Sequence, residues 1–228
     1  MPAQQTERTL DRLAALADPV RRGLYLLVVQ SPGAVSRDQA ARRARISRAL
    51  AAFHLDKLVE QGLLEASYRR LTRRRGPGAG RPAKLYRRSA LQVDVSLPPR
   101  EYELAARVFA IALASGADLR KTARDFGAGL GRAARTRARV GTRAARGTLL
   151  QQIGAVLQRH GYEPFRAPDG AIRLHNCPFD ALARDYRPLM CGTNQALLAG
   201  VVRGLGLARC RAVLDPRPGL CCVALRPS

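Results

Sequence analysis

Cysteine is the residue type whose positions in this sequence point most directly to chemistry. The five cysteines all fall in the last quarter of the chain, at Cys177, Cys191, Cys210, Cys221 and Cys222. Thiolates are the usual protein ligands of iron–sulfur clusters, and they also bind zinc. The compact Cys-x-x-Cys spacing of a zinc ribbon is absent, so these thiols would have to converge from separate elements of a folded domain. The alternative is that they are buried as small apolar side chains, as cysteines often are.

The local settings of these cysteines differ. Cys177 follows an expected strand, where the N-terminus of a following helix would lower the pKa of its thiol. Cys221 and Cys222 are adjacent in an expected strand, so we expect them to point to opposite faces and not to serve equally. His175 lies two residues before Cys177, which suggests a cysteine-dependent enzyme as an alternative. No orienting acid, oxyanion loop or nucleotide-binding fingerprint accompanies that pair, so we expect no enzyme.

A second distinctive stretch runs from Ser47 to Arg88. Residues 47–61 have helical periodicity, and residues 63–69 and 83–88 have the pattern of strands. From Arg69 to Arg88 there are nine basic residues and no acidic residue, and the sequence between the strands includes Gly-Pro-Gly-Ala-Gly. A helix followed by a hairpin with a slim basic tip is typical of a DNA-binding winged helix. Its helix enters the major groove, and the hairpin approaches the backbone or the minor groove.

Each candidate DNA contact is assigned by what its side chain can donate. Arg48 could reach guanine or phosphate, Phe53 could contact a thymine methyl group, and Arg81 could enter a minor groove. The full candidate set is Ser36, Ser47, Arg48, Phe53, His54, Lys57, Arg73, Arg74, Arg75, Arg81 and Lys84. His54 alone also fits a structural role near the backbone. Basic loops are often only solvated faces, but the helix and the hairpin together are more specific than either.

Helix caps and helix breakers define the elements that must position this stretch. Four helices are expected, at residues 10–17, 19–30, 36–45 and 47–61, after a frayed N-terminus. Asp18 is expected to cap the second helix, with Pro19 at its first position. Ser36 and Ser47 are expected to cap the third and fourth helices, and Gly62 to end the fourth. The order predicts a helix-turn-helix followed by a hairpin.

Three segments of this region resemble the arsenic-repressor (ArsR) type of winged-helix regulators. They are Leu-Ala-Asp-Pro-Val-Arg-Arg at residues 16–22, Phe-His-Leu-Asp-Lys-Leu-Val-Glu-Gln-Gly-Leu-Leu at 53–64, and Gly-Arg-Pro-Ala-Lys-Leu-Tyr-Arg at 80–87. Within that type they look most like the branch that includes the repressor of the Suf iron–sulfur assembly operon. The resemblance implies a homodimer, a palindromic operator in double-stranded DNA and an effector that changes DNA affinity. Ala49 and Leu50 depart from it, because such recognition helices often carry Ser or Thr there.

The resemblance extends to the cysteines. Those that match its pattern are Cys177, Cys191 and one of Cys221 or Cys222. It implies an iron–sulfur cluster, 4Fe-4S or 2Fe-2S, as the sensed species. The side chains that could complete the ligand set are Cys210, His175 and Asp180. Zinc is the alternative metal.

Composition narrows the class of partner. The formal net charge of +23 and the isoelectric point near 11.5 indicate a polyanionic partner, nucleic acid before membrane. Apolar residues make up 46% of the chain, which is enough for folded cores. No run of eighteen apolar residues occurs, and the N-terminus lacks the apolar core of a signal peptide. We therefore expect a soluble, cytoplasmic protein with no membrane partner.

Residues 93–147 are expected to connect the DNA-binding region to the cysteines. Residues 93–99 have the pattern of a linker, and residues 101–115 that of a helix that is apolar nearly all round. Such a helix must be buried, either in a dimer seam or in the core of one chain. Residues 127–147 combine glycines and arginines without an acid, which favours an exposed connector. That connector could be a second electrostatic contact to DNA or only a solvated helix face.

The C-terminal region is expected to be an antiparallel sheet backed by helices. The turn residues Pro-Asp-Gly at 168–170 and Pro-Arg-Pro-Gly at 216–219 each predict a hairpin. Helices are expected at residues 148–160, 178–184 and 188–204. The predicted fold class is thus mainly α with α+β. Its domains are a winged helix-turn-helix domain at 1–92, a helical linker and dimerisation region at 93–147, and a cysteine-containing α+β sensor domain at 148–228.

These observations predict a sequence-specific DNA-binding transcription regulator, a repressor. The predicted control is by an iron–sulfur cluster or a metal on the C-terminal cysteines. The alternatives are a winged-helix regulator with a structural or sensory zinc, and a cysteine-dependent enzyme.

Overall fold

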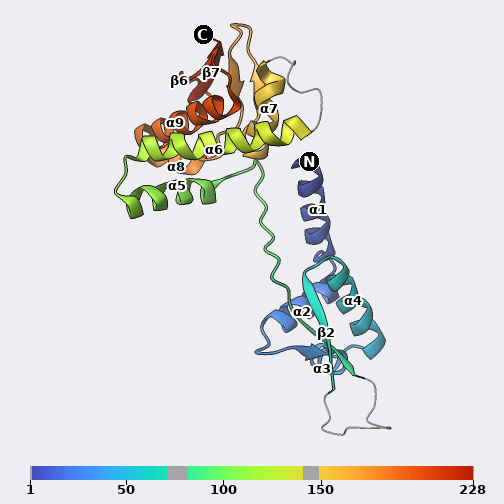
Figure 1. Ribbon diagram of the computed structural model, residues 1–228. Coiled ribbons are helices and arrows are strands. Elements are labelled where there is room, and N and C mark those ends of the chain that lie inside the picture. Colours follow the sequence, from blue (N-terminus) through green and yellow to red (C-terminus); the bar gives the residue numbers. More distant parts are fainter. Residues whose placement is uncertain (1, 71–81, 141–148, 228) are drawn as a thin grey trace. The chain divides into compact units, whose positions relative to one another are not determined.

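The computed structural model describes residues 2–70, 82–140 and 149–227, and the chain forms two compact units (Figure 1). The first unit comprises residues 1–95 and the second comprises residues 96–228. The predicted domain boundary at residue 92 lies close to the observed one. The helices predicted within a separate linker region, 93–147, pack inside the second unit instead.

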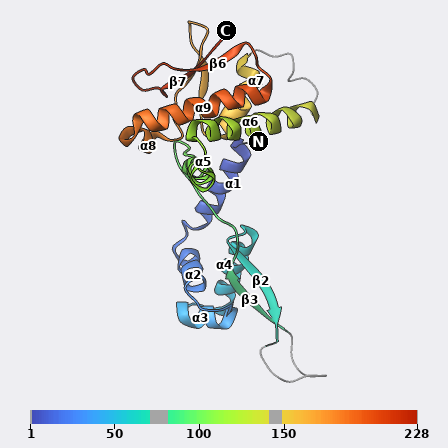
Figure 2. The same cartoon turned by 60° about the vertical axis from the view of Figure 1, so that its left-hand side comes forward.

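The first unit contains helices and one small sheet. Its helices are α1 (Pro2–Ala15), α2 (Pro19–Val29), α3 (Arg37–Ala44) and α4 (Arg48–Glu60), and its strands are β1 (Val35–Ser36), β2 (Leu64–Arg69) and β3 (Ala83–Arg88). The antiparallel sheet has the order β1-β3-β2, with Ala66 of β2 opposite Tyr86 of β3. Figure 2 shows β2 and β3 running out from the helices as a hairpin. The first nine residues were predicted to be frayed, but α1 begins at Pro2.

Side-chain caps begin the helices of this unit where the sequence predicts them. Asp18 accepts a hydrogen bond from the backbone nitrogen of Arg21 at the start of α2. Ser36 caps α3, and the side chain of Gln39 accepts in return from the backbone nitrogen of Ser36. The side chain of Ser47 caps α4 by accepting from the backbone nitrogen of Leu50. The core that these helices enclose contains the fully buried side chains Leu24, Leu55, Leu58 and Tyr86.

The second unit is a four-stranded sheet with helices. The helices are α5 (Tyr102–Ser115), α6 (Leu119–Val140), α7 (Leu149–Arg159), α8 (Asp180–Asp185) and α9 (Arg187–Leu205). The strands are β4 (Pro164–Arg166), β5 (Ile172–Leu174), β6 (Cys210–Leu214) and β7 (Val223–Pro227). Their order is β4-β5-β7-β6, and all pairs are antiparallel. Both predicted hairpins are present, and β5 and β7 join them into one sheet.

Helix α6 packs along α9 with glycine at the points of closest approach. A Cβ atom at Gly127 would overlap the backbone oxygen of Leu197, and one at Gly200 would overlap that of Arg124. The prediction of a connector from residue 127 onward is therefore wrong as far as Val140, the last residue of α6, but Arg132, Arg135 and Arg137 are exposed, as the alternative of a solvated helix face has it. The glycines that suggested an irregular segment are instead the residues that allow two helix backbones to touch.

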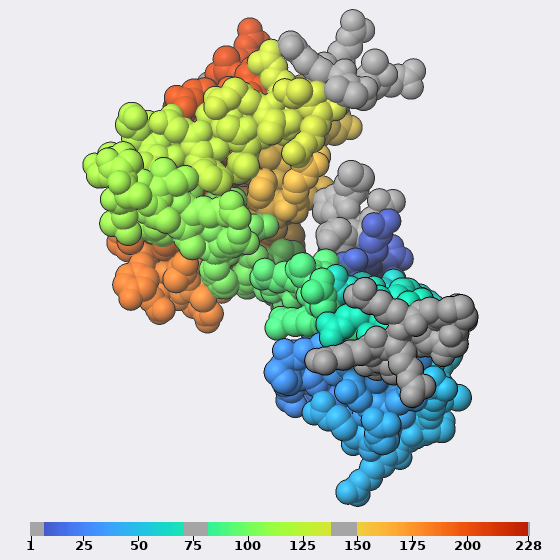
Figure 3. Space-filling view, turned by 60° about the horizontal axis from the view of Figure 1, so that its bottom comes forward, coloured from blue at the N-terminus to red at the C-terminus, as the bar shows by residue number. Residues whose placement is uncertain are grey.

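Helix α5 is only partly buried within its own chain. Leu104, Ala105 and Val108 lie in the core of the second unit. At the edge of this buried side Ile111 is half exposed, and Leu113, which points away from the core, is 82% exposed. The space-filling view shows α5 and α6 side by side on one face of this unit (Figure 3). Among the helices of the described residues, none is long and apolar enough to cross a membrane.

Candidate DNA-binding surface and thiol site

The helix-turn-helix of the first unit is held at its joint by small residues and a left-handed turn. Ala40 of α3 and Ala51 of α4 are fully buried, which lets the two helices approach closely. Arg45 adopts a φ of 55° between the helices, and the backbone nitrogen of Ile46 donates to the oxygen of Ala41. The joint therefore fixes α4 against α3 and leaves one face of α4 free for a groove.

That free face carries two of the predicted contacts. The side chain of Arg48 is 72% exposed, and its guanidinium forms an ion pair of 2.7 Å with Asp38 of α3. An exposed pair of this kind contributes at most about 1 kcal/mol, so a phosphate or a guanine can replace Asp38. Phe53 is 54% exposed and meets His54 edge-on, with 5.2 Å between ring centroids. Both residues are thus exposed on α4.

Other predicted contacts have structural roles in the first unit. His54 is buried, and its Nδ1 accepts a hydrogen bond from the guanidinium of Arg21 at 3.4 Å. Ser36 and Ser47 use their hydroxyl groups as helix caps. Lys57 is half-buried and pairs with Glu60, three residues along the same helix. The remaining candidates on the hairpin, Arg73, Arg74, Arg75 and Arg81, lie outside the described residues.

Lys84 is part of a polar cluster that ties β3 to α4. Its ammonium donates to Asp56 at 2.7 Å, and the hydroxyl of Tyr86 donates to the same carboxylate at 2.6 Å. Arg37 donates to the Tyr86 hydroxyl and also pairs with Asp56. Burial alone would raise the pKa of Asp56, but the hydrogen bonds from Lys84 and Tyr86 lower it overall. Burial and the bond to Asp56 raise the pKa of Tyr86 to about 12, so it stays a donor.

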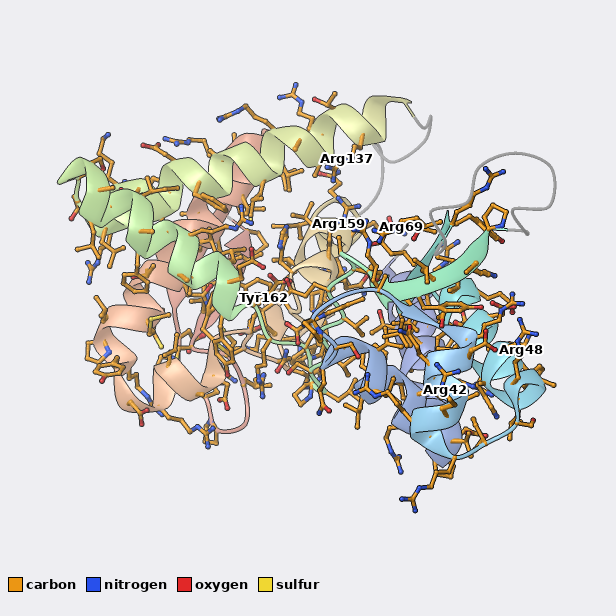
Figure 4. The ribbon with its side chains drawn as sticks, turned by 90° about the horizontal axis from the view of Figure 1, so that it is seen from below. Arg42, Arg48, Arg69, Arg137, Arg159 and Tyr162 are labelled. Atoms are coloured by element: carbon orange, nitrogen blue, oxygen red, sulfur yellow. The ribbon has the colours of Figure 1, made fainter. Side chains whose placement is uncertain are left out.

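Three arginines missing from the predicted set extend the exposed basic surface of the first unit. Arg42 lies in the last turn of α3, Arg45 lies between α3 and α4, and Arg69 is the last residue of β2. All three are exposed. Figure 4 shows the side chains of Arg42 and Arg48 projecting from neighbouring helices. Their position at the end of one helix and the start of the next was the sequence signal that could have identified Arg42 and Arg45.

In the second unit four of the five cysteines lie close together as two neighbouring pairs. Cys177, just before α8, pairs with Cys221, and Cys191 on α9 pairs with Cys222. Cys221 and Cys222 immediately precede β7 rather than lying in it, so the alternation of a strand does not apply to them. The expected strand position of the two cysteines is therefore wrong, and Cys221 is buried whereas Cys222 is only half-buried.

The two pairs differ in which thiol gives up its proton. The hydrogen bond from Cys221 lowers the pKa of Cys177, and the backbone nitrogen of Phe179 adds to this effect. The same bond to Cys177, together with burial, raises the pKa of the Cys221 thiol far above its usual range. Burial and the bond to Cys222 raise the pKa of Cys191 to about 12. Cys177 is therefore the thiol of its pair that favours the ionised form.

A cavity of about 600 Å³ opens over three of these thiols, Cys177, Cys221 and Cys222. Its wall also contains the basic side chains Arg100, Arg187 and Arg217 and the turn between β6 and β7, residues 216–219. Positive charge around a thiol favours its thiolate. The cavity thus offers sulfur ligands, with Cys177 as the one whose pKa is lowered, in a setting that suits an anionic group.

The candidate ligands other than these four cysteines have different positions. Cys210 begins β6 in the hydrophobic core, where burial raises its pKa to about 11. His175 lines the cavity, and its ring is stacked on Phe165 with 4.0 Å between centroids. Asp180 also lines the cavity and pairs with Arg100 and Arg184. Within the described residues, no three His, Cys, Asp or Glu side chains surround one point closely enough to hold a single metal ion.

Buried ionic contacts hold the turn that closes the cavity. Arg173 of β5 is buried, and its guanidinium pairs with Asp215 at the start of the turn. Arg226 of β7 binds the same carboxylate at 2.8 Å, and Arg217 of the turn pairs with Asp215 and Asp169. The hydrogen bonds from Arg226 and Arg173 lower the pKa of Asp215. The carboxylate therefore stays charged and anchors the turn beside the thiols.

Asn176 connects the thiol site to the segment that leads in from the first unit. Its amide nitrogen donates to the backbone oxygens of Pro99 and Gly161, at 2.8 and 2.6 Å. Its amide oxygen accepts from Arg100, which also donates to the backbone oxygen of Cys177 at 2.9 Å. Residues 99 and 100 are thus bonded directly to the residue beside the most acidic thiol. We refer to this set of contacts as the Asn176 latch.

Comparison with known proteins gives one family match. A family model described as a helix-turn-helix domain matches residues 16–66. The match covers α2, α3, α4 and the start of β2, less than a quarter of the chain. No curated protein and no solved structure matches the chain. Residues 16–66 therefore form a helix-turn-helix domain, which indicates DNA binding and transcription regulation.

Proposed function

We propose that this helix-turn-helix protein is a sequence-specific transcription regulator, and a repressor in keeping with its resemblance to the ArsR type. The observation that carries the proposal is the helix-turn-helix itself, with α4 fixed at a tight joint and its exposed face free. The +23 net charge supports a nucleic-acid partner, because it favours association with phosphate at any sequence.

DNA reading would be divided between base contacts and phosphate contacts. Arg48 stands at the first position of α4, the end of a recognition helix that enters the major groove. Its guanidinium can donate to the O6 and N7 of guanine, while Phe53 can contact a thymine methyl group. Arg42 and Arg45 lie beside the joint, where their charge would neutralise backbone phosphates without reading sequence.

We also propose that two copies of the chain act together. The apolar side chains Ile111 and Leu113 are exposed on two different sides of α5, and a second copy would cover at least one of them. A two-fold dimer would place two copies of α4 on two half-sites, as a palindromic operator requires. The expected interface therefore includes the outward face of α5.

The thiol site would hold the sensed group, an iron–sulfur cluster. The donor set fits such a cluster, because soft thiolates from three separate segments meet below an open cavity with arginines in its wall. A cluster distributes its thiolates over several irons, so it does not need three ligands around one point. A single zinc ion does need them, and the described side chains do not provide that arrangement. When bound, the cluster would supply a coordination state that changes with redox conditions and iron supply.

The Asn176 latch offers a physical route from this site to the DNA-binding unit. Any shift of Cys177 moves its backbone oxygen and the adjacent amide of Asn176, and both are bonded to residues 99 and 100. Loading or unloading of the site would therefore bias the position of the segment that carries the first unit. In a dimer this changes the spacing of two recognition helices and so the affinity for two half-sites.

The DNA-binding proposal is tested by selecting bound sequences from a pool of random duplexes. The affinity of the protein for the most enriched duplex is then measured. Arg48→Ala should relax the preference at one base pair by about 1–3 kcal/mol, whereas Arg42→Ala should weaken all sequences alike. Arg107→Ala, an exposed arginine of the second unit, is the matched control. Failure to enrich any sequence, with Arg48→Ala and Arg107→Ala equally active, would contradict the proposal.

The cofactor proposal is tested by iron, sulfide and zinc analysis of anaerobically purified protein, with an absorption spectrum. Cys177→Ala and Cys191→Ala should lose the iron and the sulfide. Cys210→Ala should keep both, because Cys210 lies in the core and not in the paired set. Zinc in place of iron, lost in the same two variants, would identify the alternative metal. Protein without either metal would overturn the sensor role and leave the DNA-binding role standing.

The latch is tested separately from loading. Asn176→Ala removes the hydrogen bonds to Pro99 and Gly161 but no thiol. We expect this variant to load the site and to bind DNA, yet to show the same DNA affinity with and without the bound group. An unchanged difference between the two forms would assign the coupling to another route.

A further inference from the structure

Some exposed arginines of the second unit have an acidic partner, and others, among them Arg120 and Arg124 at the start of α6, have none among the described residues. Several exposed arginines on its helices pair with an acid, and the clearest pairs are Arg107 with Glu103, Arg184 with Asp180, and Arg203 with Asp125. Between residues 126 and 162 the sequence contains seven arginines and no aspartate or glutamate. The segment therefore contains no acidic residue that could neutralise its positive charge.

Four of these seven arginines have described side chains. Arg132, Arg135 and Arg137 lie in the last part of α6, and Arg159 ends α7. All four are exposed, and in the described part of the chain none of them forms an ion pair. They are named the α6–α7 arginine surface below.

The surface concentrates charge where two helices meet. Arg137 and Arg159 both lie close enough to His160 for their charges to add to the effect of burial in lowering the pKa of that imidazole. Figure 4 shows Arg137 projecting from α6 toward α7, where Arg159 is labelled. Two like charges gather here with no counter-charge among the described residues, so the site gains free energy from an external anion.

We infer that the α6–α7 arginine surface is a second docking surface for the phosphate backbone of double-stranded DNA. This inference rests on the proposed DNA-binding function. The linear arrangement suits a polymer, because Arg132 and Arg137 are separated by roughly 7.5 Å of helix rise, over which a duplex presents about four phosphate charges. Arginine is also the side chain that best matches phosphate with two parallel hydrogen bonds.

An anionic membrane is the less favoured partner for this surface. A helix that binds a membrane inserts an apolar face beside its basic one. The apolar face of α6 is used inside the unit, where Phe126 and Leu130 pack on the core and Gly127 touches α9. Only the charged face is left for a partner, and charge alone directs it to a polyanion such as DNA.

The surface would act on affinity and not on sequence choice. Phosphate contacts position a protein on a duplex without reading bases. Since both surfaces belong to one chain, binding of the helix-turn-helix raises the effective concentration of DNA at the second surface. The full chain should therefore bind with a steeper salt dependence than its winged helix alone would give.

The test compares two triple variants of the full chain on a random-sequence duplex and on the selected duplex, at several salt concentrations. One replaces unpaired arginines (Arg135→Gln, Arg137→Gln, Arg159→Gln). The other replaces paired arginines of the same unit (Arg107→Gln, Arg184→Gln, Arg203→Gln), so both lose the same net charge. The surface variant should lose about 0.9 of the log–log salt slope for each contact removed, roughly 2.7 in all, on both duplexes. The control should keep a slope close to that of the unaltered protein.

Equal slopes for the two variants would overturn the inference, because net charge alone would then account for the loss. A loss that appears on phosphatidylglycerol vesicles and not on DNA would also overturn it, in favour of a membrane. An unaltered protein that binds neither duplex would instead defeat the proposed function. Circular dichroism and the iron content of both variants check that the second unit is folded.

Discussion

The candidate functional side chains of the first unit lie on its surface, whereas those of the second unit lie in its interior. The first unit uses its core to display arginines, and Arg42, Arg45 and Arg48 all lie on its surface around one helix joint. The second unit draws its functional groups inward, so that thiols from three segments pair beside a cavity. An outward surface tolerates small movements of the backbone, because long side chains adapt to a ligand. An inward site does not, because each thiol depends on the packing of a different element.

This difference predicts that overpacking in the second unit should have the largest effect of any small substitution. In Gly200→Ala the added methyl group would overlap the backbone oxygen of Arg124. Helices α6 and α9 would have to separate, at a cost of about 3 kcal/mol in the free energy of unfolding of this unit. Urea denaturation followed by amide resonances of each unit would measure this loss, together with lower iron content. The first unit should be unchanged.

Gly154→Ala is the matched control for that substitution. It also adds one methyl group to a helix of the second unit, but nothing lies within 4 Å of the new atom. Alanine favours a helix over glycine by about 0.8–1 kcal/mol, so this variant should be slightly more stable. A similar loss in both variants would mean that the contact between α6 and α9 is not as tight as the structure indicates.

The first unit should respond less to the loss of one internal contact. Tyr86→Phe removes the hydroxyl that joins Asp56 and Arg37 but leaves the pair of Asp56 with Lys84. A hydrogen bond to a charged group contributes about 1.5 kcal/mol or more, so the unfolding free energy of the first unit should fall by about that amount. Tyr68→Phe, on the exposed part of β2, should change it by less than ~0.5 kcal/mol. Equal effects would show that the cluster is not a stabilising contact.

The contrast between the units also explains what the sequence could predict. The helix-turn-helix follows from local signals, since Ser36 and Ser47 specify helix starts within three residues of themselves. The hairpins follow from turn residues in the same way. The sequence did not predict the contact of Lys84 with Asp56, because Asp56 lies in a different element and no local pattern relates the two.

The thiol site and the glycine contact are long-range features. The sequence identified the cysteines, but which thiol meets which depends on how α9 and the start of β7 pack. Gly127 and Gly131 predict a break in a helix unless a partner helix is known to lie against them, and α9 comes some seventy residues later. Local composition therefore describes the first unit well and the second unit only in outline.

The smallest predicted effect is a shift in the pKa of His160, and it tests the α6–α7 arginine surface. Burial, followed by the charges of Arg159 and Arg137, lowers the pKa of His160 below its usual 6.5. Between that lowered pKa and 6.5 the unfolded chain binds more protons than the folded one. The contribution of neutral His160 to stability is thus present above pH 6.5 and is lost as the pH falls through that window. In Arg137→Gln, Arg159→Gln the pKa of His160 should rise but stay below 6.5, because burial remains.

Proton NMR titration of the His160 ring measures this shift, with His160→Gln to assign its resonance. Bound duplex DNA should raise the pKa of His160 in the unaltered protein as well, because phosphates would offset the same two guanidinium charges. The double variant Arg107→Gln, Arg203→Gln lacks two paired arginines of the same unit and should leave the titration unchanged. If DNA binds tightly while His160 titrates as in the free protein, the phosphates do not reach α6 and α7, and the first unit alone carries the contact.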